Sequence, residues 1–216
     1  MQKITEVHLF IALSLSIGYL LGRLHKRYRS ANFQNRGEAL VTRAIKSNFS
    51  APDYHLLNHI TLKLKDGTTQ IDHILVSRFG VFVIETKDYS GWIFANPNTA
   101  TWTQTFFKSK FQFQNPILQN ARHVQAVQKL LDFLPHTSIK PIVVFAGSAE
   151  FMTDIPTGVF SIPAFIEHVK NFNEEEMSLN RLQFCVGRLE TARLAISGKT
   201  DLEHLQSLER RHRTKT

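Results

Sequence analysis

One short segment, GVFVIETK at residues 80–87, limits the possible folds of this chain more than any other. Residues 81–84 are apolar at every position, so a strand here must be covered on both of its faces. The segment QIDHILV at 70–76 lies just before it and reads as a second strand, with a turn between the two. At 216 residues, the chain suits one α/β domain with appendages.

Three polar residues of this strand pair are candidates for one site. If Val76 faces Val81 across the turn, Asp72 lies opposite Glu85, with Cβ atoms about 4.5–5.5 Å apart. Lys87 is two residues beyond Glu85 and therefore points to the same face of the sheet. Two carboxylates that close repel each other unless one is protonated or a cation lies between them, and a hard ion such as Mg²⁺ prefers oxygen ligands. A solvated strand face is the alternative, but the apolar surroundings argue against it.

Several further motifs occur in a fixed order around these strands. They are GEALV at 37–41, QIDHILVS at 70–77, GVFVIETKDYSG at 80–91, Trp102, and QNPILQNARHV at 114–124. In this combination they resemble the nuclease-related domain (NERD) family, which is similar in turn to the PD-(D/E)xK nuclease superfamily. The resemblance covers residues 33–150. It implies a restriction-endonuclease-like α/β fold, a central mixed sheet flanked by helices, that cleaves phosphodiester bonds with the help of a metal ion.

The resemblance also implies the roles of individual residues. Asp72 and Glu85 would bind Mg²⁺ or Mn²⁺ together with the backbone carbonyl of Thr86, and Lys87 would be the catalytic lysine. The lysine would orient a water molecule or stabilise charge on the phosphate in the transition state. Glu38, on the first predicted helix, matches an acid that often completes such sites, where it could bind a second ion or anchor the first through water.

Gln119 matches the glutamine of the helix that follows the strands in this family. It shares a helix face with His123, one turn later, and such a pair is commonly an ordinary hydrogen-bonding surface. Glu38 also has a structural interpretation, because an acid in the first turn of a helix complements the helix dipole. Only the matching strands favour the catalytic interpretation of Glu38.

The remaining segments predict further helices and strands on both sides of the central strand pair. In the first helix, Ala39, Leu40, Ile45 and Phe49 supply much of the apolar face. Both tryptophans are expected to pack against other side chains, and base stacking by one of them is the alternative. His55 and His59 have the spacing of a helical zinc site, but they lie in a predicted strand, where four residues span about 13 Å. The predicted elements are a helix from 35 to 49, a strand at 54–64, an outer hairpin at 91–102, a helix from 116, strands at 141–147 and 159–162, and two closing helices from 163 and 179.

The N-terminal segment 7–22 is apolar, contains no Lys, Arg, Asp or Glu, and predicts a membrane anchor within residues 4–22. As a helix, residues 7–22 would span about 24 Å. A cleaved signal peptide and a buried core helix are the alternatives. Residues 23–29 carry four basic residues, so the positive-inside tendency leaves the rest of the chain in the cytoplasm, tethered by one span to the inner membrane. The expected organisation is a membrane anchor at 1–30, the nuclease-like domain at 33–150, and a helical extension with a basic tail at 151–216.

The formal charge of +8 arises from the two ends of the chain. Residues 23–29 and 210–216 each carry four basic residues and no acid, and the remainder balances 18 basic against 18 acidic residues. A strand-binding groove must therefore be local, and candidates to line it are Lys108, Lys110 and Arg122. No phosphate-binding G-x-x-x-x-G-K-[ST] loop occurs, so no nucleotide cofactor is indicated.

These features together predict a membrane-tethered nuclease that depends on Mg²⁺ or Mn²⁺ and acts on nucleic acid, with DNA favoured over RNA. The main alternative is a catalytically silent module of the same fold that binds nucleic acid or protein at the inner membrane surface. A scaffold that acts mainly through its anchor and basic ends is the third.

Overall fold

The structure, a computed structural model, describes residues 36–107 and 109–194. From Gly37 onward these residues belong to one compact unit. The predicted anchor at 4–22 and the basic tail at 210–216 lie outside the described residues. Within the described part of the chain, no helix is long and apolar enough to cross a membrane.

A five-stranded mixed sheet forms the centre of this unit, in the order β1-β2-β3-β7-β9. The first three strands form an antiparallel meander, in which Val76 pairs with Val81 as the sequence predicts. The last two strands run parallel to β3 and complete the mixed sheet. The strands are β1 (Tyr54–Leu64), β2 (Gly67–Ser77), β3 (Gly80–Lys87), β7 (Ile139–Phe145) and β9 (Val159–Ser161).

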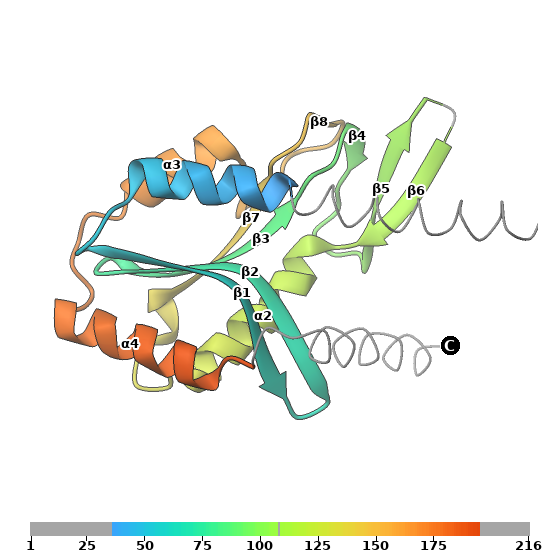
Figure 1. Cartoon of the computed structure of the whole chain (residues 1–216). Coiled ribbons are helices and arrows are strands. Elements are labelled where there is room, and N and C mark those ends of the chain that lie inside the picture. Colours follow the sequence, from blue (N-terminus) through green and yellow to red (C-terminus); the bar gives the residue numbers. More distant parts are fainter. Residues whose placement is uncertain (1–35, 108, 195–216) are drawn as a thin grey trace, which may run out of the picture. The chain divides into compact units, whose positions relative to one another are not determined.

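Helices cover both faces of this sheet, which confirms the predicted central mixed sheet flanked by helices (Figure 1). A helix at 36–48 and α3 (Ile162–Lys170) cover one face, and α2 (Pro116–Leu130) and α4 (Leu179–Ala192) cover the other. Strand β3 is buried at all eight positions because its side chains alternate between these two layers. Phe82 and Ile84 join the core under helix 36–48 and α3, whereas Val81 and Val83 join the core under α2 and α4.

The apolar face of helix 36–48 differs from the predicted one at one position. Ala39 is exposed, and Val41 takes its place in the core with Ile45 and Phe49. These three residues are spaced by four, so they lie one above the other on a single face of the helix. Ala39 is two positions from Val41 and therefore points away from the sheet.

A second sheet, in the order β6-β5-β4-β8, packs beside the first. Trp102 is fully buried there, as predicted, and its indole Nε1 donates to the carbonyl of Asn96 at 2.8 Å. Trp92 differs, because it alternates with the buried Ile93 and is 49% exposed. The amide of Asn115 caps α2 and also binds carbonyls of the β4–β5 loop, which fastens this sheet to the helix. Its strands are β4 (Gly91–Phe94), β5 (Thr101–Phe106), β6 (Ser109–Gln114) and β8 (Ala149–Phe151).

Candidate active site

The first sheet divides at the point where the predicted acids lie. Pairing between β2 and β3 ends at His73 and Ile84, whereas β1–β2 pairing continues to Gly67 and β3–β7 pairing continues to Lys87. The two strand pairs diverge beyond this point, as Figure 1 shows. We call the gap between Asp72 of β2 and residues 85–87 of β3 the fork.

Asp72 lies at the point where β2 and β3 separate. Its Oδ2 accepts a hydrogen bond of 2.7 Å from the backbone N–H of Thr86, a donor that β2 no longer pairs. The N–H and C=O of one strand residue point to the same side of the strand, so the Thr86 carbonyl is also directed into the fork. His73, the next residue, lies on the opposite face, where it is fully buried and hydrogen bonded to Asn58. Burial lowers the pKa of His73 to about 3, so it is a neutral interior residue.

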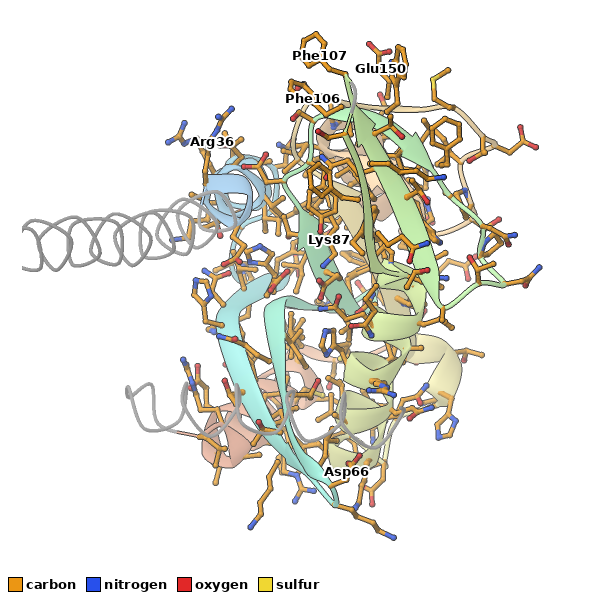
Figure 2. The ribbon with its side chains drawn as sticks, turned by 90° about the vertical axis from the view of Figure 1, so that its right-hand side faces the viewer. Arg36, Asp66, Lys87, Phe106, Phe107 and Glu150 are labelled. Carbon is orange, nitrogen blue, oxygen red and sulfur yellow. The ribbon has the colours of Figure 1, made fainter. Side chains whose placement is uncertain are left out.

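Lys87 lies inside the fork, with only 7% of its surface exposed. Its Nζ donates to Glu85 Oε1 at 2.6 Å and to Gln119 Oε1 at 3.0 Å. Figure 2 shows Lys87 between the β1–β2 hairpin and α2. Burial opposes the ammonium charge, but the adjacent Glu85 carboxylate outweighs it and raises the pKa of Lys87 above its usual value. The lysine is therefore a charged donor at neutral pH.

Glu85 is almost completely buried, and both of its oxygens are engaged. Oε1 accepts from Lys87, and Oε2 accepts from Nε2 of His123 at 3.0 Å. The other ring nitrogen of His123 is hydrogen bonded to the hydroxyl of Thr69 at 2.7 Å. Burial raises the pKa of Glu85, but Lys87 and His123 together lower it below its usual value, so this carboxylate is charged. The sequence placed His123 beside Gln119 on one helix face, and both residues contact the Glu85–Lys87 pair.

Glu38 approaches the fork from the start of helix 36–48, on the other face of the sheet. Burial and repulsion by Glu85 raise its pKa to about 7, although Lys87 partly offsets them. The pKa of Asp72 is raised well above its usual value by burial and by the charges of Glu85 and Glu38. The structure therefore places Glu38, Asp72, Glu85, Lys87 and Gln119 around one fork, where two carboxylates resist ionisation.

His59 is a further residue at the fork that the sequence did not indicate. Its φ of 52° lies in the left-handed region, and it interrupts the β1–β2 pairing between Asn58 and Ile60. Such a conformation is uncommon for a residue other than glycine and costs about 1–3 kcal/mol. It brings Nδ1 to 3.2 Å from Glu38 Oε2, without the geometry of a hydrogen bond. The predicted strand is confirmed, so His55 and His59 do not form a zinc pair.

Comparisons with known proteins match the part of the chain that carries the fork. The profile of the nuclease-related domain, NERD, matches residues 34–146, which include every fork residue named above. The chain belongs to the NERD family. This family is part of the PD-(D/E)xK-like nuclease superfamily.

A curated protein of similar sequence covers part of this NERD protein. An uncharacterized protein of Bacillus anthracis is 38% identical to it over 128 residues, which cover 59% of this chain and 60% of that protein. The match thus spans less than two thirds of the relative's length. No solved structure matches the chain.

The donor chemistry of the NERD fork fits a hard divalent cation. Asp72 and Glu38 have raised pKa values, which means that the cluster already holds more negative charge than its surroundings stabilise. Glu38 Oε2 is also buried without a hydrogen bond. A dication between the acids would relieve both conditions. Within the described residues, however, no three His, Cys, Asp or Glu side chains form a ready metal cage, and both Glu85 oxygens have other partners.

The raised pKa values of Glu38 and Asp72 predict that the metal-free NERD domain loses stability as pH rises. The folded state binds protons more tightly than the unfolded chain at Glu38 and Asp72, so these two groups lower the free energy of unfolding as pH rises above about 4.5 and through 7. His73 has the opposite effect below about pH 6.5, because its pKa is lowered and only the unfolded chain binds a proton there. After allowance for solvent screening at Glu38, we therefore expect a net loss of about 0.5–1 kcal/mol between pH 7 and 8.5. Thermal melts in EDTA should show this fall, and added Mg²⁺ should reduce it. A melting temperature that rises over this interval would contradict the assignment.

Gly37 lets the first helix approach the fork. A Cβ at Gly37 would lie 2.7 Å from Cβ of Asp88 and 3.5 Å from Cβ of Ala146. Gly37→Ala should therefore push away the helix that carries Glu38 and cost about 1–3 kcal/mol. Gly187→Ala is the matched control, because nothing lies within 4 Å of its Cβ position on α4, and it should stabilise the protein by up to about 1 kcal/mol. Denaturant unfolding of both variants measures the difference, and equal effects would show that Gly37 is not tightly packed.

Proposed function

We propose that this protein is a metal-dependent nuclease that uses Mg²⁺ or Mn²⁺ to hydrolyse phosphodiester bonds of nucleic acid, with DNA favoured over RNA, and that it uses no nucleotide cofactor. The observation that carries this proposal is the convergence of three carboxylates and a buried, charged lysine at the fork. Membership of the nuclease-related family supports the same reaction class.

The residues that would hold the ion are Asp72, Glu85 and the carbonyl of Thr86, with Glu38 as a further ligand or as an anchor through water. When bound, the ion would polarise the scissile phosphate and lower the pKa of a water molecule beside it. The contribution of Asp72 is supported by its position, since one oxygen is held by the N–H of Thr86 and the carboxylate is thereby fixed in the fork. His123 and Thr69 would fix the orientation of Glu85 in the same way.

Lys87 would act as a fixed positive charge. Its raised pKa argues against a role as a general base, because it retains its proton at neutral pH. An ammonium held at 2.6 Å from Glu85 and 3.0 Å from Gln119 still has a third proton to donate. That proton could orient the attacking water or stabilise the charge that develops on the phosphate oxygens.

A cleavage assay on the purified full-length chain tests this proposal. Linear and circular DNA and an RNA of matched length would be incubated with Mg²⁺, with Mn²⁺ and with EDTA. We expect cleavage with either metal, none in EDTA, and none by Asp72→Asn under any condition. Undiminished cleavage in EDTA or by Asp72→Asn would assign the activity to a contaminant or to another mechanism. If the folded protein cleaves nothing with Mg²⁺ and nothing with Mn²⁺, the nuclease proposal is wrong.

A catalytically silent nucleic-acid- or protein-binding module is the second candidate. It is favoured by the contacts of the two Glu85 oxygens with Lys87 and His123, because an ion at this carboxylate would have to compete with both of them. Metal titration separates the two candidates, because a silent module should show no Mn²⁺ binding that depends on Asp72.

We further propose that residues 4–22 tether the domain to the inner face of the cytoplasmic membrane as a single span. The support is the uncharged segment 7–22 and the four basic residues at 23–29. The full-length chain should remain in the membrane fraction through alkaline carbonate extraction, and deletion of residues 1–30 should release it. Extraction of the full-length chain by carbonate would rule out a spanning helix.

A further inference from the structure

A basic groove lies beside the fork, between the tip of the β1–β2 hairpin and α2. Its volume is about 350 Å³. We propose that this groove, hereafter the basic groove, binds the phosphate backbone of the nucleic acid whose scissile bond lies in the fork, so this inference rests on the proposed function. The residues that line it are Lys63, Leu64, Lys65, Asp66, Arg122, Gln125, Ala126 and Lys129.

The positive charge of this groove is concentrated in one place, and salt bridges within the described residues do not offset it. Four of its lining residues are cationic and one, Asp66, is acidic. None of the four cations forms a salt bridge with any residue in the described part of the chain, whereas Arg78, Lys140 and Arg193 elsewhere on the surface each pair with an acid. Between the two basic ends the sequence is neutral overall, so this concentration of positive charge is not a consequence of composition. A groove lined by exposed Lys and Arg is the usual binding surface for a polyanion such as nucleic acid.

The basic groove and the proposed active site are built on neighbouring residues of the same hairpin and the same helix. Thr69, which is hydrogen bonded to His123, pairs with Leu62, and Lys63 is the next residue of β1. On α2, Arg122 directly precedes His123. The hydrogen-bonded chain from Glu85 to Thr69 therefore passes next to residues that line the groove. Figure 2 shows Lys87 and Asp66 on one face of the molecule, with the hairpin and α2 side by side between them.

The dimensions of the groove suit a short run of phosphates. Arg122 and Lys129 are separated by seven residues, or about 10 Å along a helix. A nucleic-acid strand advances about 3.4 Å per phosphate along the axis of a duplex, so this length covers about three phosphates. The sequence predicts Lys108, Lys110 and Arg122 as candidates to line such a groove. Arg122 does line it, Lys110 lies on β6 of the second sheet, and Lys108 lies outside the described residues.

The test is a binding measurement on full-length protein that carries Asp72→Asn to prevent cleavage. The groove variant adds Lys65→Gln and Lys129→Gln, and the control variant instead adds Arg43→Gln and Lys46→Gln, two exposed positions on the helix that covers the opposite face. Fluorescence anisotropy with a labelled oligonucleotide gives the dissociation constant at several salt concentrations. We expect the groove variant to bind about tenfold more weakly, with a slope of log K against log salt that is shallower by about 1.4 to 1.8, and the control to match its parent. Equal affinity and slope for groove variant and parent would overturn the proposal.

Two further experiments distinguish nucleic acid from lipid as the source of the bound phosphate, and the groove proposal from the nuclease proposal. Vesicles that contain anionic lipid should bind the groove variant and its parent equally, and a loss confined to vesicles would make this a membrane-facing surface and overturn the inference. If the groove variant loses oligonucleotide binding but wild type cleaves nothing with either metal, the nuclease proposal fails and the groove stands. A third result is that wild type cleaves DNA, whereas Lys65→Gln and Lys129→Gln together, in an otherwise wild-type chain, change neither cleavage nor binding. That result would overturn the groove proposal and leave the nuclease proposal standing.

Discussion

Lys87→Met is expected to abolish cleavage and to lower the stability of the metal-free protein at the same time. The substitution keeps the length of the side chain but leaves the buried Glu85 carboxylate without the cation 2.6 Å away. Removal of one partner from a buried ion pair costs about 3–5 kcal/mol. For a domain of this size we expect a fall in melting temperature of about 10 °C in EDTA. Mg²⁺ should restore part of this loss if it binds Glu85, whereas cleavage should remain absent.

Two further variants show which role of Lys87 is responsible. Glu85→Gln combined with Lys87→Met removes both charges and should recover most of the stability lost by Lys87→Met alone, which gives a strongly non-additive double-mutant cycle. Lys87→Arg retains the charge but changes the donor geometry, so it should preserve stability better than activity. Wild-type cleavage by Lys87→Met across a Mg²⁺ titration would remove Lys87 from the mechanism. An unchanged melting temperature in EDTA would show that the ion pair does not stabilise the fork.

Asp72→Asn is expected to have the opposite effect on stability. The pKa of Asp72 is raised because its charge is opposed by burial and by two other carboxylates, so a neutral side chain of the same shape should stabilise the metal-free protein. An asparagine oxygen can still accept the hydrogen bond from Thr86 N–H. Cleavage should nevertheless fall by at least about 10²–10³-fold, because the metal loses a charged ligand.

Asp53→Asn is the matched control for this substitution. Asp53 is half exposed and pairs with Arg78 at 3.2 Å, so its loss should cost less than about 1 kcal/mol and leave cleavage unchanged. Thermal melts at pH 8 in EDTA and cleavage rates in Mg²⁺ measure both variants. A lower melting temperature for Asp72→Asn than for wild type would mean that Asp72 is stabilised as an anion by contacts other than a metal.

The strand pair at the fork could be predicted from sequence because local pattern alone determines it. The apolar run at 81–84 requires cover on both faces, and a short turn fixes the pairing of Val76 with Val81. Asp72, Glu85 and Lys87 then follow by counting along the strands. Gln119 follows from the family resemblance, and helical spacing places His123 on the same face, although the contact of each with its strand partner depends on how α2 packs.

Other parts of the site depend on tertiary structure that no local pattern encodes. The left-handed conformation of His59 is imposed where β1 bends beside the fork, and the same residues would form an ordinary strand elsewhere. Thr69 meets His123 only because the β1–β2 hairpin continues past the end of its pairing with β3. Strand β8 has three residues and pairs with β4 across more than fifty positions of sequence, so it has no recognisable period. Trp92 resembles Trp102 in sequence but lies on the outer face of the second sheet.

The most direct test of the account is calorimetric titration of Mn²⁺ into the metal-free, full-length chain at pH 7, in two buffers with different heats of ionisation. A metal ion that binds at the fork must displace protons from Glu38 and Asp72, whose pKa values are raised. The account predicts binding that releases protons, and an affinity at least about tenfold weaker with fewer protons released for Asp72→Asn. Equal affinity in wild type and Asp72→Asn, or binding without proton release, would contradict it.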